Sequence, residues 1–123
     1  MKIMESAENY LETILVLSNR LGNVRSIDIA NELNYSKPSV SVAMKNLRQS
    51  DCIETDPNGF ITLTEKGREI ADKIYERHTI LSQWFVALGV SPEIAAEDAC
   101  RIEHVISPET FEALKKHLAE DGK

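Results

Sequence analysis

The 123-residue sequence lacks an apolar run long enough to cross a membrane. Its longest stretch without Asp, Glu, Lys or Arg covers residues 78–92, whereas a spanning helix needs about 20 predominantly apolar residues. The N-terminal segment MKIMESAENY is charged by its fifth residue and has no apolar core of signal-peptide length. With five Gly, four Pro and two Cys, the composition also excludes collagen-like chains and disulfide scaffolds. We therefore expect a cytoplasmic protein without a membrane partner.

The sequence is also poor in cysteine, and the two it has, Cys52 and Cys100, lie far apart in the chain. In a reducing compartment both are expected to be free thiols, so any role they have comes from reactivity or metal ligation. The content of 42% hydrophobic and 28% charged residues argues against disorder. It suits one compact domain, or two small ones that share a core.

A net charge of −6 argues at first against a nucleic-acid partner, but the charge is unevenly distributed. Residues 37–50 contain Lys37, Lys45 and Arg48 and no acidic residue. An acidic protein with such a segment can still present one basic face to phosphate groups.

The spacing of the apolar residues predicts a mainly helical protein with six helices. The first helix has apolar positions from Ile3 to Leu21, and the fourth has an apolar stripe from Ile70 to Leu88 that includes His78. The residues expected to cap or end helices are Gly22, Ser26, Ser36, Thr64, Gly89, Ser91 and Ser107.

Two short β-type runs, residues 52–55 and 60–63, lie between the third and fourth helices. The segment between them, Asp56-Pro57-Asn58-Gly59, contains Asn-Gly, which is a strong signal for a hairpin turn. The order helix, helix, turn, helix, hairpin predicts a winged helix-turn-helix over residues 1–64. A helical domain is expected over residues 65–123.

The third helix is the expected reader of double-stranded DNA. Its stripe of Val40, Met44 and Leu47 faces the core, which leaves short hydroxyl side chains and lysine free to approach the major groove. An ordinary amphipathic helix with a solvated polar face is the alternative. The residues expected to contact DNA are Lys37, Pro38, Ser39, Ser41, Val42 and Lys45.

The expected fifth helix carries a candidate metal site. Cys100, Glu103 and His104 are spaced i, i+3 and i+4, so a thiolate, a carboxylate and an imidazole share one helix face. Such a set suits a divalent transition metal, although by itself it also occurs on solvated helix faces. His78 is a second candidate, with a hydrogen-bonded core histidine as the alternative.

An enzyme is not expected. The glycines are scattered and form no phosphate-binding loop. A nucleophile pair of Cys100 and His104 on one helix would lack oxyanion donors and an orienting partner.

Several segments resemble the diphtheria-toxin-repressor and manganese-transport-regulator family, and the resemblance covers about residues 5–118. The matching segments are ENYLETI at 8–14, SKPSVS at 36–41, LTEKG at 63–67, Arg77-His78, and DACRIEHVIS at 98–107. The resemblance implies a winged helix-turn-helix domain followed by a helical dimerisation domain. It also implies that Fe(II) or Mn(II) activates a homodimer to bind a palindromic operator and repress metal-uptake genes. The third, SH3-like domain of longer members has no counterpart, so the expected architecture is the short, manganese-regulator type.

The same resemblance implies a ligand set. Cys100, Glu103 and His104 match ligands of the activating metal site, while Glu12 and His78 match ligands of the two-metal site of manganese-type members. Asn9 stands where the family has Met or Asp. Cys at position 100 is typical of iron-type members, Glu12 and His78 match manganese-type members, and Asn9 matches neither, so the metal stays open. The alternatives are a vestigial site, a site tuned to zinc or cobalt, and a metal sensor that acts through protein contacts without its own operator.

Overall fold

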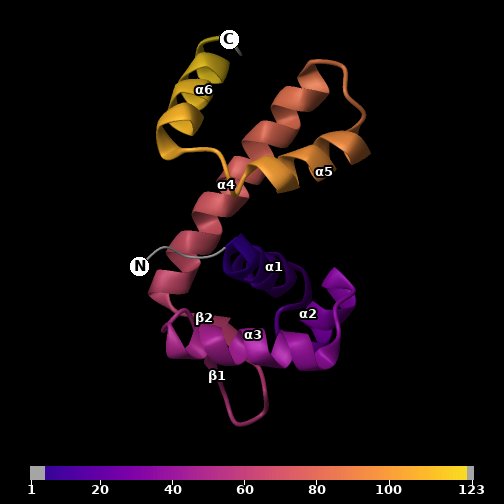
Figure 1. Cartoon of the computed structure of the whole chain (residues 1–123), viewed down its shortest axis with the longest axis vertical. Coiled ribbons are helices and arrows are strands. Elements are labelled where there is room, and N and C mark those ends of the chain that lie inside the picture. The colour runs from indigo at the N-terminus through magenta and orange to yellow at the C-terminus, as the bar shows by residue number, and fades with distance from the viewer. Residues whose placement is uncertain (1–4, 122–123) are drawn as a thin grey trace. The chain divides into compact units, whose positions relative to one another are not determined.

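The computed structural model describes residues 5–121, and the chain divides into two compact units between Asp72 and Lys73 (Figure 1). The described residues form six helices and one antiparallel hairpin, which confirms the expected mainly helical fold class. No helix among them is long and apolar enough to cross a membrane. The elements are α1 (Glu5–Leu21), α2 (Ser26–Leu33), α3 (Lys37–Gln49), β1 (Ile53–Thr55), β2 (Ile61–Leu63), α4 (Glu65–Ala87), α5 (Pro92–Ile102) and α6 (Pro108–Asp121).

The core of the first unit lies where α1 contacts α2, α3 and β2. Leu11 and Ile14 of α1 are fully buried there, together with Val40 of α3. The stripe of Val40, Met44 and Leu47 is buried as its spacing predicts. Burying this stripe fixes which face of α3 points to solvent.

Helix caps in the first unit follow the sequence with one exception. The Ser36 hydroxyl accepts a hydrogen bond from the Ser39 N–H, so Ser36 caps α3 as expected. The prediction that Ser26 caps α2 is wrong, because Ser26 is already the first helical residue and Arg25 occupies the cap. The Asp28 carboxylate, in the first turn of α2, accepts from the N–H of the cap residue Arg25 at 2.9 Å.

The hairpin pairs Ile53 with Leu63 and Thr55 with Ile61, close to the expected strands. Its turn is held by the Asp56 carboxylate, whose Oδ1 accepts from the N–H groups of Asn58 and Phe60 at 2.9 Å. Gly59 completes the turn with φ of +85°, a conformation that glycine adopts without strain. The Asp56 side chain therefore stabilises the turn of the hairpin.

In the second unit, α5 and α6 begin after the expected serine caps, Ser91 and Ser107. Ser91 accepts from the Ile94 N–H, and Ser107 accepts from the Thr110 N–H. The core of this unit is made of small and large apolar side chains from all three helices. Its buried members are Ile74, Leu81, Ala95, Ala99 and Phe111.

Among the described residues of the expected apolar stripes of α1 and α4, two are exposed. Leu21 is 52% exposed and Leu88 is 65% exposed. Leu21 is the last residue of α1, and Leu88 follows the last residue of α4, so both lie at the end of a helix. Ile3, the expected start of the first stripe, lies outside the described residues.

Candidate metal centre and nucleic-acid interface

The end of α5 brings together the three predicted ligands Cys100, Glu103 and His104. The prediction that all three lie within one helix needs correction, because α5 ends at Ile102 and Glu103 is its C-cap. Glu103 keeps right-handed helical angles, φ −57° and ψ −26°, and its N–H bonds to the Ala99 carbonyl at 2.9 Å. The cap thus continues the helical turn, and one ligand atom from each of the three side chains lies within 4.8 Å of the others.

His78 of α4 joins this group. Its Nδ1 lies 2.9 Å from Oε2 of Glu103, and Nε2 of His104 lies 3.4 Å from Oε1 of the same carboxylate. The structure therefore brings together four predicted site residues in the second unit. We call His78, Cys100, Glu103 and His104 the ligand cluster.

The electrostatics of the ligand cluster favour a cation. The Glu103 side chain is fully buried, and only 3% of the His104 side chain is exposed. A buried carboxylate is costly unless it is paired or coordinates a metal. Oε1 of Glu103 accepts no hydrogen bond from any described residue. A divalent transition metal fits this donor set, because one thiolate, one carboxylate and two imidazoles provide ligands of mixed softness.

One residue near the cluster was not singled out as a site residue from the sequence. Arg77 precedes His78 on α4, and its guanidinium donates a hydrogen bond to the main-chain carbonyl of Glu103 at 2.9 Å. The signals in the sequence are its place beside His78 and the resemblance of the pair Arg77-His78 to the family.

The remaining predicted ligands, Asn9 and Glu12, belong to the first unit. They lie on α1 at i and i+3, so both side chains are on one helix face. Asn9 is half-buried and Glu12 is buried, with 8% of its surface exposed. The Thr13 hydroxyl donates a hydrogen bond to the main-chain carbonyl of Asn9 at 2.8 Å. The side-chain amide of Asn9 takes no part in this bond.

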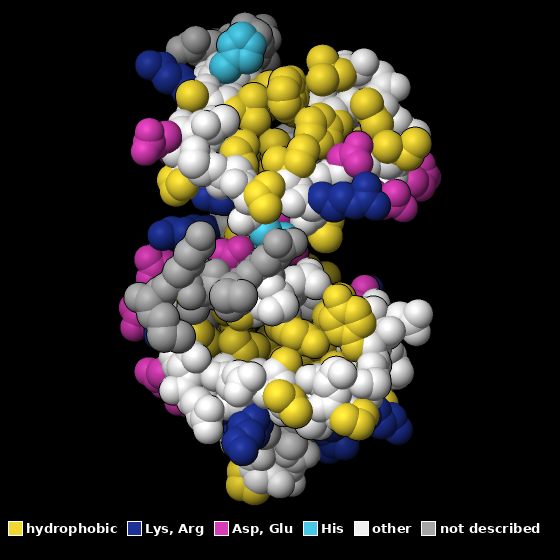
Figure 2. Space-filling model, in the orientation of Figure 1, with side chains coloured by type: hydrophobic (Ala, Val, Ile, Leu, Met, Phe, Trp, Pro, Cys, Tyr) yellow, Lys and Arg dark blue, Asp and Glu magenta, His cyan; other side chains and the backbone are white. Residues whose placement is uncertain are grey.

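The exposed face of α3 contains all the residues predicted to contact DNA. Lys37, Pro38, Ser39, Ser41, Val42 and Lys45 are each exposed. Val42 is 60% exposed although it is apolar, and α3 has no acidic residue. Figure 2 shows Lys and Arg side chains around α3 and the hairpin. This face has the small, polar and basic character that suits entry into a major groove.

Two arginines around this face make contacts that the sequence did not predict. Nη1 of Arg48 donates to the Thr55 hydroxyl at 3.3 Å and so links α3 to β1. The Arg25 guanidinium lies 4.5 Å from the centre of the Phe60 ring, which places it beside the second strand. Both interactions fix the hairpin relative to the helix-turn-helix.

The second unit also has an apolar groove of about 400 Å³ between α4 and α6. Yellow side chains gather over these helices in Figure 2. The groove is lined by Ile80, Gln83, Trp84, Ala87, Lys115, Leu118 and Ala119.

Comparison with protein families assigns both parts of the chain to one family. Residues 2–59 match the family described as "Iron dependent repressor, N-terminal DNA binding domain". Residues 64–120 match "Iron dependent repressor, metal binding and dimerisation domain".

Individual relatives agree with this. The chain is 36% identical to the transcriptional regulator MntR of Escherichia coli O6:H1, over 96% of this chain and 76% of MntR. It is 35% identical to an uncharacterized helix-turn-helix transcriptional regulator of Methanocaldococcus jannaschii, over 90% of both chains. Among solved structures, the manganese regulator SloR superposes with a TM-score of 0.82 at 30% identity, over 92% of this chain and 53% of SloR. The chain therefore spans about half the length of that structure.

Proposed function

This chain belongs to the iron-dependent repressor family, and from that premise we propose that it is a transcriptional regulator activated by Fe(II) or Mn(II). Residues 1–64 would read DNA, and residues 65–123 would bind metal and form the homodimer. We further propose that it acts in the cytoplasm, on a palindromic operator, and that it represses metal-uptake genes.

The observation that carries this proposal is the buried carboxylate of Glu103. It lies between the His78 and His104 imidazoles, and one of its oxygens accepts no hydrogen bond from a described residue. Burying a carboxylate is costly unless it is paired or coordinates a metal. The bond with His78 satisfies only Oε2, and a metal ion bound at Oε1 would compensate the rest of the buried group.

We propose that Asn9 and Glu12 complete the ligand set. Both supply oxygen donors from one face of α1, which is part of the DNA-binding unit. When bound, a divalent cation would neutralise the buried carboxylate and link donors of both units. The ligands of α1 would then hold the DNA-binding unit in one orientation, and the recognition helices of a dimer would keep a fixed spacing. A two-fold protein reads two half-sites separated by whole helical turns, so fixed spacing converts metal occupancy into DNA affinity.

Homodimerisation is supported by the surface of the second unit. The groove between α4 and α6 is mainly apolar and includes Trp84, and Val86 and Leu88 are exposed near the end of α4. Exposed apolar surface of this kind marks an interaction site. We propose that a second copy of the chain covers part of it.

The donor chemistry of the ligand cluster also supports a second candidate metal, since the cluster combines a thiol with oxygen and nitrogen donors. A site tuned to zinc or cobalt is this second candidate, and Cys100 favours it because thiolates select softer ions.

DNA selection from a random pool tests the proposed function. The full chain is incubated with Mn(II), with Fe(II) under anaerobic conditions, with Zn(II) or Co(II), and with chelator. Enrichment of a palindromic sequence with Mn(II) or Fe(II), and not with chelator, is the expected result.

Enrichment only with Zn(II) or Co(II) would favour the second candidate. Equal enrichment in chelator would indicate a vestigial site. Metal binding by calorimetry without any enrichment would indicate a sensor that acts through protein contacts.

A further inference from the structure

Among the described residues, the Arg77 side chain contacts main-chain carbonyls and an aromatic ring rather than a carboxylate. Its Nη1 donates to the carbonyl of Glu103 and to the carbonyl of Ile106, both at 2.9 Å. Its guanidinium carbon lies 5.4 Å from the centre of the Phe111 ring on α6. One side chain of α4 therefore holds the end of α5, the connecting turn and the start of α6.

These contacts supply hydrogen-bond donors at the C-terminal end of α5. The last carbonyls of a helix have no partner within the helix, and the helix dipole makes this end negative. The guanidinium bonds the carbonyl of the C-cap residue Glu103 and the carbonyl of Ile106 in the following turn, and it leaves the Glu103 carboxylate unpaired with arginine. The carboxylate is instead directed at the two imidazoles of the ligand cluster.

We propose that Arg77 is a positioning residue of the metal centre. By tying the main chain of Glu103 and Ile106 to α4, it fixes Glu103 and His104 relative to His78, its own neighbour on α4. Metal affinity depends on ligand placement, and groups that hold the ligands are worth about 10–100-fold in affinity. This inference rests on the proposed metal site and adds a residue that is not itself a ligand.

The sign of the charge effect makes the proposal testable. A guanidinium beside a cation site repels the cation, so the Coulomb interaction alone predicts tighter metal binding when Arg77 is replaced by a neutral residue. A positioning role predicts the opposite, because the ligands lose their fixed geometry.

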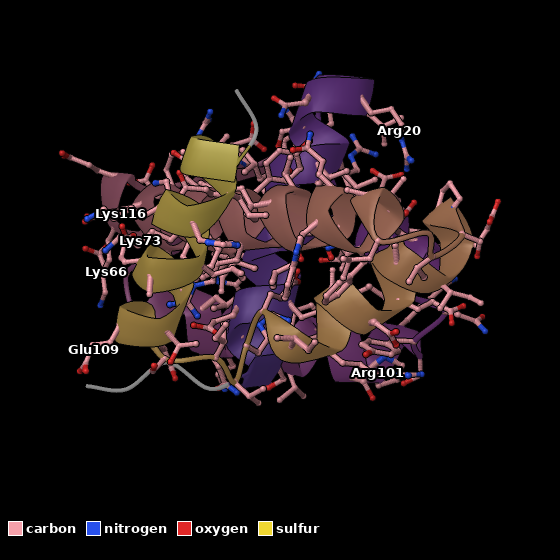
Figure 3. All side chains as sticks on the ribbon, turned by 90° about the horizontal axis from the view of Figure 1, so that it is seen from above. Arg20, Lys66, Lys73, Arg101, Glu109 and Lys116 are labelled. Atoms are coloured by element: carbon pink, nitrogen blue, oxygen red, sulfur yellow. The ribbon has the colours of Figure 1, made fainter. Side chains whose placement is uncertain are left out.

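The experiment compares Arg77→Met and Arg77→Lys with Arg101→Met in the full chain. Arg101 is the matched control, because it is also next to a ligand-cluster residue, but its side chain is 77% exposed and pairs with Asp98 at 3.6 Å (Figure 3). Each protein is titrated with Co(II), whose visible absorption reports affinity and coordination geometry. Circular dichroism and thermal melting report the fold.

We expect Arg77→Met to bind Co(II) about 10–100-fold more weakly and with an altered absorption spectrum. Arg101→Met should match the wild type in both respects. Arg77→Lys keeps one cationic donor and should fall between wild type and Arg77→Met, and it serves as the test variant if the methionine variant does not fold.

Folded Arg77 variants with wild-type affinity and spectrum, or with tighter binding, would overturn the proposal. An equal loss in Arg101→Met would also overturn it, because the loss would then not depend on the main-chain contacts of Arg77. Absence of Co(II) binding by the wild type would instead reject the metal site of the proposed function.

Discussion

At the scale of single residues, Cys100 sets the expected metal preference. A thiolate binds softer and later ions better than it binds Mn(II), whereas a carboxylate suits Mn(II). We expect Fe(II) and Co(II) to activate the wild type at lower concentrations than Mn(II) does. Cys100→Glu should narrow or reverse this difference, as measured by metal titrations of DNA binding. An unchanged Mn(II) response in the variant would show that Cys100 does not set selectivity.

The two cysteines should differ in reactivity. Cys52 is buried, and burial raises the pKa of its thiol above the ordinary value, which keeps it protonated at neutral pH. Cys100 is exposed. Because the thiolate is the reactive form, iodoacetamide at pH 7.5 should label Cys100 and spare Cys52 in the native protein.

Mass spectrometry after alkylation with and without metal checks this expectation. Metal should protect Cys100, since a ligating thiolate is no longer available to the reagent. Labelling of Cys100 at the same rate in both samples would remove it from the metal site.

The residues of the ligand cluster could be proposed from the sequence, but the contact between His78 and Glu103 could not. Cys100, Glu103 and His104 are neighbours in the sequence, so helical spacing alone placed them together. The bond between His78 and Glu103 joins residues 25 positions apart and depends on how α4 and α5 pack. The role of Arg77 also depends on that packing, which no local pattern reveals.

At the scale of elements, the proposed DNA-reading surface lies on α3. Lys45 is exposed on its polar face, opposite the buried Met44. If Lys45 contacts a phosphate, Lys45→Ala should weaken DNA binding at every salt concentration and lower the salt slope by about 1. Metal affinity should not change.

Lys116→Ala is the matched control, since it removes one exposed lysine from α6. Anisotropy titrations over a series of salt concentrations measure the slope for both variants. Identical affinity and slope in Lys45→Ala and wild type would exclude Lys45 from the interface.

The first turn of α4 is packed tightly against the hairpin. A Cβ added at Gly67 would overlap the carbonyl oxygen of Cys52, which is main chain and cannot rotate away. Thr64 closes the same junction, with its hydroxyl donating to the Asp51 carbonyl at 2.7 Å. Gly67→Ala should therefore lower the free energy of unfolding by about 1–3 kcal/mol, as overpacking generally does.

Urea denaturation of Gly67→Ala and Asp72→Ala checks this prediction. Asp72→Ala removes an exposed ion pair with Arg68 on the same helix and should cost about 0–1 kcal/mol. Equal free energies of unfolding for the two variants would contradict the prediction, because the main chain around Gly67 and Cys52 would then accommodate the added methyl group.

Helix boundaries were predicted well where capping chemistry is specific. Each of the predicted N-cap serines accepts a hydrogen bond from the N–H three residues later, as an N-cap should. These serines are Ser36, Ser91 and Ser107. The start of α2 was misplaced by one residue because Ser26 and Asp28 are both capable of capping. Which of them does so depends on the path of the chain entering the helix, and the sequence does not specify that path.

At the scale of the whole molecule, metal binding and pH should be linked. Imidazoles must be neutral and the thiol deprotonated to bind metal, so metal binding releases protons. A protonated imidazole cannot bind metal, and metal-dependent DNA binding should therefore decline as pH falls from about 7.5 to 6. Calorimetric titrations in buffers of different ionisation enthalpy count the released protons. Proton release that is independent of pH over this range would contradict the proposed ligands.

The ligand cluster is expected to control DNA binding, and His104→Ala tests this most directly. Fluorescence anisotropy of the selected palindrome is measured against Mn(II) or Fe(II) concentration, with a chelator series, for wild type and variant. We expect tight binding by the wild type only with metal, and no metal response in a folded, dimeric His104→Ala. Full affinity of the wild type in chelator, or a wild-type metal response in His104→Ala, would contradict metal control and leave a winged-helix DNA-binding protein without it.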